Sequence, residues 1–288
     1  MILGYNTNGI SNHDPVEAID LLAEIGYRSI AITVDHGFLN PFDENIDENI
    51  ATVKKALTRH KMKCVIESGA RYLLDPRRKH QPTMLSETEP GRQRRLEFLK
   101  KCVDLSAELG AACVSLWSGS PSDNCDDQVA LDRLKSQLDP LIDYTESKNQ
   151  VLGFEPEPDM FIDTMNSFER LLKWVDSPVL NLTMDIGHLF CQGEVPVVDF
   201  IGKWQERIVN IHIEDIKAGV HEHLMFGDGE IHFPPIIEKL VAIDFQGPVH
   251  VELSRHSHCA PSAARQSFEF LSPIIAQYEA EKASQNID

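Results

Sequence analysis

Four apolar segments in the second half of the chain each end in a side chain that commonly binds divalent metal ions. These side chains are three carboxylates and one imidazole, from Glu155, Asp185, His212 and Glu252. A set of mainly oxygen donors favours Mn²⁺ or Mg²⁺ and also accepts Co²⁺ or Zn²⁺. The residue types therefore predict one divalent metal ion as the cofactor, provided that the four segments end close together.

A single carboxylate at the end of a strand more often caps a helix or lies on the surface. Here the pattern occurs four times. In addition, an acid flanked by apolar residues, as Asp185 is by Met184 and Ile186, is costly to bury without a partner or an ion. The sequence therefore favours a metal site over four unrelated surface groups.

These segments belong to a longer alternation of short β-branched runs with stretches of helical period. Continuous apolar strands indicate burial on both faces, as in a parallel sheet covered by helices, and eight such units in 288 residues predict a (β/α)₈ TIM barrel. Strands are expected near residues 2–5, 28–34, 62–67, 112–117, 151–155, 179–185, 208–213 and 248–252. Helices are expected near 15–25, 46–60, 91–109, 127–147, 164–175, 196–205, 234–242 and 262–282.

The chain shows no linker or shift in composition, so residues 1–288 are interpreted as one domain. Asp14, Pro15 and Glu17 form the pattern of a helix N-terminus. A doubly wound open sheet is the alternative fold, but no glycine-rich phosphate-binding pattern follows the first strand. In a barrel the carboxyl ends of the strands meet around one mouth, which would bring the four metal-binding side chains together.

The amino-acid composition and charge exclude several classes of protein. A hydrophobic content of 42% supports a core and excludes a disordered or fibrous chain. The formal net charge of −18 disfavours nucleic acid as a partner. No signal-peptide pattern or long apolar span is present, so no membrane association is expected. Six scattered cysteines without a Cys-x-x-Cys pair are typical of free thiols, which predicts a cytoplasmic protein.

Four motifs resemble the xylose isomerase-like barrel superfamily, which includes sugar phosphate isomerases and epimerases, ketose 3-epimerases, inosose dehydratases and apurinic endonucleases. The resemblance covers nearly the whole chain but is specific only from about residue 151 onward. The motifs are Asp-x-Gly-His at 185–188, His-Ile-x-Asp at 212–215, Gly-Asp-Gly-Glu-Ile at 227–231 and Val-Glu-Leu-Ser at 251–254.

The resemblance implies that Glu155, Asp185, His212 and Glu252 hold the metal. It also implies that Glu155 and Glu252 act as an acid/base pair on opposite faces of the substrate, and that His188 contacts substrate oxygens near the reacting carbon. Removing a proton beside a carbonyl creates an enediolate, whose charge a divalent cation stabilises. Delivery of a proton to the other face by the second carboxyl group gives epimerisation, and return of the proton to the neighbouring carbon gives isomerisation.

The function expected from these residues is therefore a metal-dependent isomerase or epimerase of a sugar, sugar phosphate or keto-polyol. An inosose-type dehydratase would use the same first step and then expel a hydroxyl group. In the endonuclease branch an Asp-x-His segment holds additional zinc ions, and here residues 221–223 are His-Glu-His, so a metallohydrolase stays an alternative. His221 and His223 are interpreted either as substrate contacts or as solvated loop residues.

Four further residues are candidate substrate contacts. Arg71 lies in the basic segment 68–80 and would pair with a carboxylate or phosphate, as would Arg255 after the last strand. Trp117 would form a floor for a sugar ring, and the prolines on either side of Glu157 would turn this carboxylate toward the mouth. The alternatives are packing for Trp117 and solvated charges for the two arginines.

A barrel that binds a metabolite without catalysis is the alternative from a different functional class. The expected partner is a small carbohydrate or polyol. The helices around a barrel often pair in oligomers, so a homo-oligomer is compatible with the sequence. Residues 227–229, Gly-Asp-Gly, are more typical of a turn than of an anion-binding loop.

Overall fold

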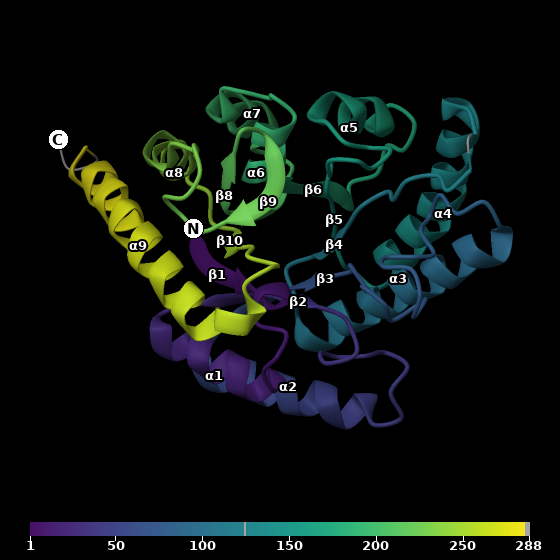
Figure 1. Cartoon of the computed structure of the whole chain (residues 1–288), viewed down its shortest axis with the longest axis horizontal. Coiled ribbons are helices and arrows are strands. Elements are labelled where there is room, and N and C mark those ends of the chain that lie inside the picture. The colour runs from purple at the N-terminus through teal and green to yellow at the C-terminus, as the bar shows by residue number, and fades with distance from the viewer. Residues whose placement is uncertain (124, 286–288) are drawn as a thin grey trace.

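The computed structural model of the chain describes residues 1–123 and 125–285. Eight parallel strands close into a barrel, and helices surround it, which confirms the predicted TIM barrel over the open sheet (Figure 1). The barrel strands are β1 (Ile2–Asn6), β2 (Ser29–Thr33), β3 (Lys63–Glu67), β4 (Val114–Leu116), β5 (Leu152–Phe154), β6 (Leu180–Asp185), β7 (Ile208–Ile213) and β10 (Pro248–Val251). Their order around the barrel is β1-β10-β7-β6-β5-β4-β3-β2.

Each predicted helix is present at its expected place, the last one after the final strand and the others between strands. The helices are α1 (Pro15–Ile25), α2 (Ile46–His60), α3 (Glu89–Leu109), α4 (Asp127–Ser147), α5 (Met165–Leu172), α6 (Ile186–Cys191), α7 (Val197–Trp204), α8 (Phe233–Ala242) and α9 (Ala260–Gln285). The carboxylate of Asp14 caps α1 by accepting the backbone N–H groups of Val16 and Glu17, as its sequence pattern predicts.

Helix α6 and a β-hairpin were not predicted from the sequence, and both lie near the mouth of the barrel. Helix α6 is too short to show a helical period and begins directly after β6. A hairpin of β8 (Asp215–Lys217) and β9 (Val220–Leu224) follows β7 and forms a sheet separate from the barrel. Its strands are short and rich in polar residues, so they lack the apolar pattern of the barrel strands.

The hydrophobic core lies mainly between the strands and the surrounding helices. Phe98 of α3, Phe168 of α5 and Ile237 of α8 are fully buried in it, and one cluster of buried residues extends along the chain from Tyr5 to Leu271. Inside the barrel, by contrast, many buried side chains are polar. The outer apolar layer therefore stabilises the fold and leaves the interior free for a polar site.

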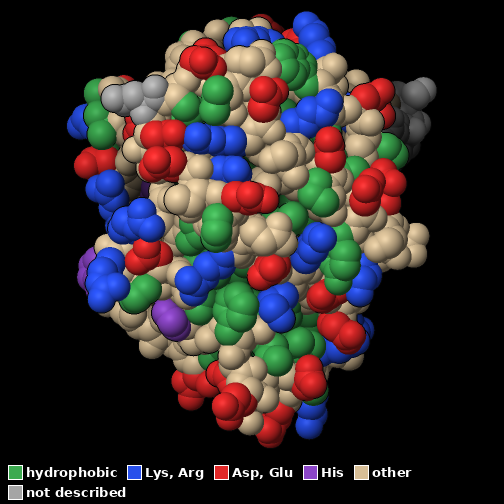
Figure 2. Space-filling view, turned by 90° about the vertical axis from the view of Figure 1, so that its right-hand side faces the viewer, with side chains coloured by type: hydrophobic (Ala, Val, Ile, Leu, Met, Phe, Trp, Pro, Cys, Tyr) green, Lys and Arg blue, Asp and Glu red, His purple; other side chains and the backbone are tan. Residues whose placement is uncertain are grey.

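The surface seen in Figure 2 carries acidic and basic side chains interspersed with one another. No continuous basic patch is visible on this face among the residues described. In the described ranges 1–123 and 125–285, no helix combines the length and the apolar character needed to cross a membrane.

Candidate active site

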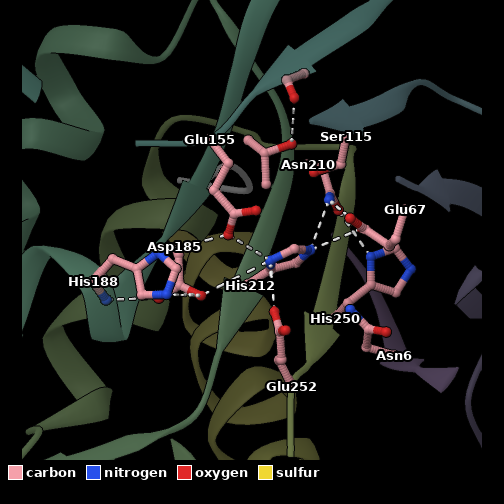
Figure 3. A network of polar contacts seen from close by, with 12 residues as sticks. Asn6, Glu67, Ser115, Glu155, Asp185, His188, Asn210, His212, His250 and Glu252 are labelled. Carbon is pink, nitrogen blue, oxygen red and sulfur yellow. Dashed lines mark hydrogen bonds and ion pairs between the residues drawn. The ribbon is translucent and has the colours of Figure 1, made fainter. Parts of the chain in front are cut away.

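The four predicted metal-binding residues meet at the carboxyl end of the barrel (Figure 3). Glu155 follows β5, Asp185 ends β6, His212 lies in β7 and Glu252 follows β10. Asp185 and His212 are paired in the register of β6 and β7, so the sheet itself places them side by side. One ligand atom from each of the four residues lies within 4.8 Å of the others.

The three carboxylates converge on one nitrogen of the imidazole. Nδ1 of His212 lies 2.7 Å from Oε2 of Glu252, 2.9 Å from Oε1 of Glu155 and 3.8 Å from Oδ2 of Asp185. None of the described residues donates a hydrogen bond to this buried Oδ2 atom. Three carboxylates, buried in Glu155 and Asp185 and partly exposed in Glu252, surround one imidazole and leave an excess of negative charge, which fits a divalent cation.

The pKa values reflect this concentration of charge. Burial raises the pKa of Glu155 to about 8. Burial alone would lower the pKa of His212, but the carboxylates of Glu67, Glu252 and Glu155 raise it well above its ordinary value. Burial alone would raise the pKa of Glu252, but His212 lowers it below its ordinary value. Without an ion, the site therefore holds protons that a divalent cation would displace.

Glu67, which the sequence analysis did not single out, holds the other side of the imidazole. It ends β3, and its Oε1 atom lies 2.9 Å from Nε2 of His212 and accepts a hydrogen bond from Nδ2 of Asn210 at 3.2 Å. Oδ1 of Asn210 in turn accepts a hydrogen bond from Nδ1 of His250 at 2.8 Å. The predicted strand at 62–67 ends in this glutamate, so its position was visible in the sequence.

A cavity of about 340 Å³ opens above this centre and gathers the predicted substrate contacts. Asp185 is not among the residues that line the cavity. The predicted residues that line it are Arg71, Trp117, Glu155, Glu157, His188, His212, His221, His223, Glu252 and Arg255.

His188 lies between the carboxylates and the hairpin. Its backbone N–H donates to Oδ1 of Asp185 at 2.7 Å, so this aspartate also caps α6. Its Nδ1 atom lies 3.3 Å from the carbonyl oxygen of Pro156, and its Nε2 atom lies 2.9 Å from Nε2 of His221. Burial lowers the pKa of His188 to about 4, which favours a neutral imidazole at the wall of the cavity.

His221 and His223 lie on β9 and form a second group with His188. One nitrogen of each imidazole lies within 4.8 Å of the others, a spacing that can hold a metal ion. Glu214 is fully buried beside this group, 3.8 Å from Nδ1 of His223, and its oxygens have no hydrogen-bond donor in the described part of the chain. A Cβ atom at Gly187 would overlap with Glu214, so glycine allows their close approach.

The remaining predicted substrate contacts differ in their exposure and in the contacts that they already make within the protein. Trp117 packs edge-on against His80, and the guanidinium of Arg95 lies 5.1 Å from its ring, so packing is one of its roles. The side chain of Arg255 is 59% exposed and lies 3.3 Å from Glu222. Glu157 is partly exposed at the wall of the cavity.

Arg71 is already engaged inside the protein. Its Nη2 atom donates to the carbonyl oxygen of Asn8 at 2.7 Å, and its Nη1 atom lies 3.5 Å from Asp35. Asn8, a second residue that the sequence analysis missed, donates from Nδ2 to Oε1 of Glu252 at 2.6 Å. The two residues are 244 positions apart, so no local pattern links them.

The Gly-Asp-Gly segment is a turn, as its sequence suggests, and wraps around an aspartate of the hairpin. The carboxylate of Asp215 accepts the backbone N–H groups of Gly227, Gly229 and Ile231 at 2.9 to 3.1 Å. These amides are therefore not free to bind a substrate anion. The contact attaches the end of the hairpin to the loop that leads to α8.

A sequence model of the family described as "Xylose isomerase-like TIM barrel" matches residues 19–274. The chain belongs to this xylose isomerase-like TIM-barrel family. An L-ribulose-5-phosphate 3-epimerase from Escherichia coli is 22% identical over 86% of this chain and 85% of its own length. An inosose dehydratase from Clostridium beijerinckii is 27% identical over 41% of this chain and 45% of its own length.

The solved structures give the same fold for this xylose isomerase-like protein. A D-tagatose 3-epimerase-like protein superposes with a TM-score of 0.78 and 22% sequence identity, over 98% of this chain and 99% of that chain. The chain spans about half the length of the first curated relatives it matches. The family match therefore agrees with the resemblance of the four motifs.

Proposed function

We propose that the protein is a divalent-metal-dependent epimerase or isomerase that acts on a sugar, a sugar phosphate or a keto-polyol. The observation that carries this proposal is the convergence of Glu155, Asp185 and Glu252 on Nδ1 of His212, at the floor of a cavity of about 340 Å³. Relatives named as sugar epimerases support the substrate class.

The residues of the chain are suited to moving a proton between carbon and carboxylate. A divalent ion held there would supply positive charge that stabilises negative charge developing on substrate oxygens. Glu155 and Glu252 come from β5 and β10, which are separated by β6 and β7 in the barrel, so they approach the cavity from different directions. If one of the two groups, as a carboxylate, removes a proton and the other, as a carboxylic acid, delivers a different proton to the opposite face, the carbon is inverted.

The other residues of the cavity have supporting roles in this proposal. His188, at the wall between Pro156 and His221, would contact substrate oxygens as a neutral imidazole. Trp117 would cover an apolar face of the sugar, and Glu157 and the hairpin histidines would contact its hydroxyl groups. Arg255 is exposed enough at the edge of the cavity to meet an anionic group of the substrate.

The direct test is solvent exchange. The protein loaded with Mn²⁺ is incubated in D₂O with ketoses, ketose phosphates and inosose analogues, the ion is then removed, and the substrates are followed by proton NMR. We expect deuterium at the carbon beside the carbonyl of the true substrate, together with an epimer or isomer. Deuterium followed by loss of a hydroxyl group would assign a dehydratase. Absence of exchange in the whole panel would favour a barrel that binds a metabolite without catalysis.

A second candidate function is a metallohydrolase, which the group of His188, His221 and His223 favours. Three imidazoles next to a carboxylate centre can hold a further ion of the zinc type. Metal analysis of the purified protein separates the two functions. One ion per chain supports the epimerase, whereas two or more ions that are lost together with phosphodiesterase activity in His221→Ala would support the hydrolase.

A further inference from the structure

Asn8 is hydrogen-bonded to the carboxylate of Glu252. The amide Nδ2 of Asn8 donates to Oε1 of Glu252 at 2.6 Å, while Oε2 of the same carboxylate lies 2.7 Å from Nδ1 of His212. The two oxygens therefore face different partners, and Oε2 is the one that faces the candidate ligand His212. Rotation of the amide by half a turn would place its own oxygen against the carboxylate, so this orientation of Asn8 is the favourable one.

The backbone of Asn8 is itself held by side chains from distant parts of the chain. Asn8 lies in η1 (Thr7–Gly9), the short turn after β1, where its N–H donates to Oδ1 of Asn6 at 3.0 Å. Its carbonyl oxygen accepts one hydrogen bond from Nη2 of Arg71 at 2.7 Å and another from Oγ of Ser257 at 3.0 Å. The turn is thus fixed between the loops that follow β3 and β10.

The backbone conformation and the neighbours of Arg71 hold it in contact with the carbonyl oxygen of Asn8. The Arg71 φ angle of 37° is in the left-handed region, which residues with a Cβ atom rarely adopt, so its position is maintained by its contacts. Asp35 lies 3.5 Å from Nη1 and faces the guanidinium from the loop after β2. Ser257, which bonds to the same carbonyl oxygen, is not among the described residues that line the cavity. Arg71 and Ser257 therefore both donate hydrogen bonds to the carbonyl oxygen of Asn8.

We propose that Asn8 is a positioning residue for Glu252, and that Arg71 and Ser257 act on the metal centre through Asn8. This inference rests on the proposed function, because it requires Glu252 to bind a divalent ion. It gives Arg71 a role different from the recognition of a substrate anion. Hydrogen bonds that orient metal ligands typically change metal affinity by about 10-fold to 100-fold when they are removed.

The experiment is a calorimetric titration of metal-free protein with Mn²⁺, for the wild type and for Asn8→Ala, Arg71→Ala, Ser257→Ala and Arg255→Ala. We expect the Kd for Mn²⁺ to rise about tenfold or more in Asn8→Ala. Smaller increases are expected in Arg71→Ala and Ser257→Ala. Neither should add to the effect of Asn8→Ala when combined with it, because both act through the same residue.

Arg255→Ala is the control matched in charge, since it also removes one cation from the lining of the cavity. Loss of a cation near a metal site by itself strengthens cation binding. The loss of charge alone would thus strengthen Mn²⁺ binding in both variants. The proposed role of Arg71 predicts instead that Arg71→Ala weakens Mn²⁺ binding, whereas Arg255→Ala leaves it unchanged or strengthens it. Melting temperatures of the metal-free variants report folding. If Asn8→Ala fails to fold, the test is made with Ser257→Ala, which removes only a single hydroxyl group.

The outcomes separate the inference from the proposed function. A wild-type protein that binds no divalent ion overturns both. A wild-type protein that binds Mn²⁺, with an equal Kd for folded Asn8→Ala or for folded Ser257→Ala, overturns this inference alone. If kinetics show that Arg71→Ala raises KM while the Kd for Mn²⁺ stays constant, Arg71 is a substrate contact and its part of the inference is wrong. A lower kcat at constant KM supports positioning.

Discussion

Oε1 of Glu67 lies 2.9 Å from Nε2 of His212, on the side of the imidazole opposite to the nitrogen that faces Glu155 and Glu252. A carboxylate in this place holds the proton of a neutral imidazole on Nε2 and leaves the lone pair of Nδ1 for a metal ion. If His212 binds a metal ion through Nδ1, Glu67 would therefore orient the imidazole and favour the required tautomer.

Replacing Glu67 should weaken metal binding more when both its hydrogen bond and its charge are lost than when only the charge is lost. Glu67→Ala removes both the hydrogen bond and the charge, so we expect the Kd for Mn²⁺ to rise by about 10-fold to 100-fold. Glu67→Gln keeps an acceptor oxygen for Nε2 and loses only the charge, so its Kd should rise less. Calorimetric titration of both variants measures the difference. Equal affinity in Glu67→Ala and the wild type would mean that His212 needs no such partner.

Metal binding should depend on pH with a definite sign. Burial raises the pKa of Glu155 to about 8, and the surrounding carboxylates raise that of His212 well above its ordinary value despite its burial. In the metal-free site these groups hold protons at neutral pH, and a bound ion must displace them. Affinity for Mn²⁺ should therefore increase from pH 6 to pH 8. Calorimetry in two buffers that differ in ionisation enthalpy measures the protons released. A constant Kd with no proton release would contradict this prediction.

The barrel and its four candidate metal-binding residues were predictable because both depend on local patterns. Apolar runs identified the strands, and the acid or imidazole at the end of a run identified Glu155, Asp185, His212 and Glu252. Glu67 ends a run in the same way and could have been included by the same reasoning. Asn8 could not, because it lies in a turn without periodicity and contacts Glu252 across nearly the whole chain.

His188 should contribute to turnover more than to retention of the metal. Its nitrogens face Pro156 and His221 at 3.3 and 2.9 Å, and the carboxylates of Glu155 and Asp185 are each 3.7 Å away. We expect His188→Asn to lower kcat by about 100-fold, the range of a lost proton-transfer or polarising group, and to keep its metal. Activity and metal content are measured on the same sample. Loss of the ion from a folded His188→Asn would make His188 a ligand.

The two candidate proton-transfer residues can be tested by removing their basicity. An amide cannot accept a proton, so Glu155→Gln and Glu252→Gln should each lower kcat by about 100-fold or more. Both residues also face the metal position, so occupancy must be measured in the same preparations. Only a variant that retains its ion reports on proton transfer. A metal-loaded Glu252→Gln with nearly wild-type turnover and deuterium exchange would remove Glu252 from the mechanism.

His80 should make the stability of the fold depend on pH. Burial lowers its pKa from 6.5 to about 4, and its Nδ1 atom lies 2.7 Å from the carbonyl oxygen of Gly69. Between these pH values the unfolded chain binds a proton that the folded protein does not, so the free energy of unfolding falls as pH falls.

His80→Asn is a suitable control for this effect, because asparagine tolerates the φ angle of 65° at this position and does not titrate. Urea unfolding at pH 7 and at pH 4.5 should show a smaller loss of stability in the variant than in the wild type. The other buried histidines contribute equally to both proteins and cancel in this comparison. Parallel losses in the two proteins would show that His80 titrates normally.

The hairpin of β8 and β9 pairs with itself and not with any barrel strand, and Asp215 fastens it to the following loop through backbone amides. The side chains at positions 220–224 can therefore be exchanged without breaking a hydrogen bond of the barrel. Side chains of the hairpin that line the cavity can therefore change while the barrel keeps its strand pairing. Directed evolution of a new substrate range should accordingly begin with libraries in this hairpin, because its variation leaves the strand pairing of the barrel intact.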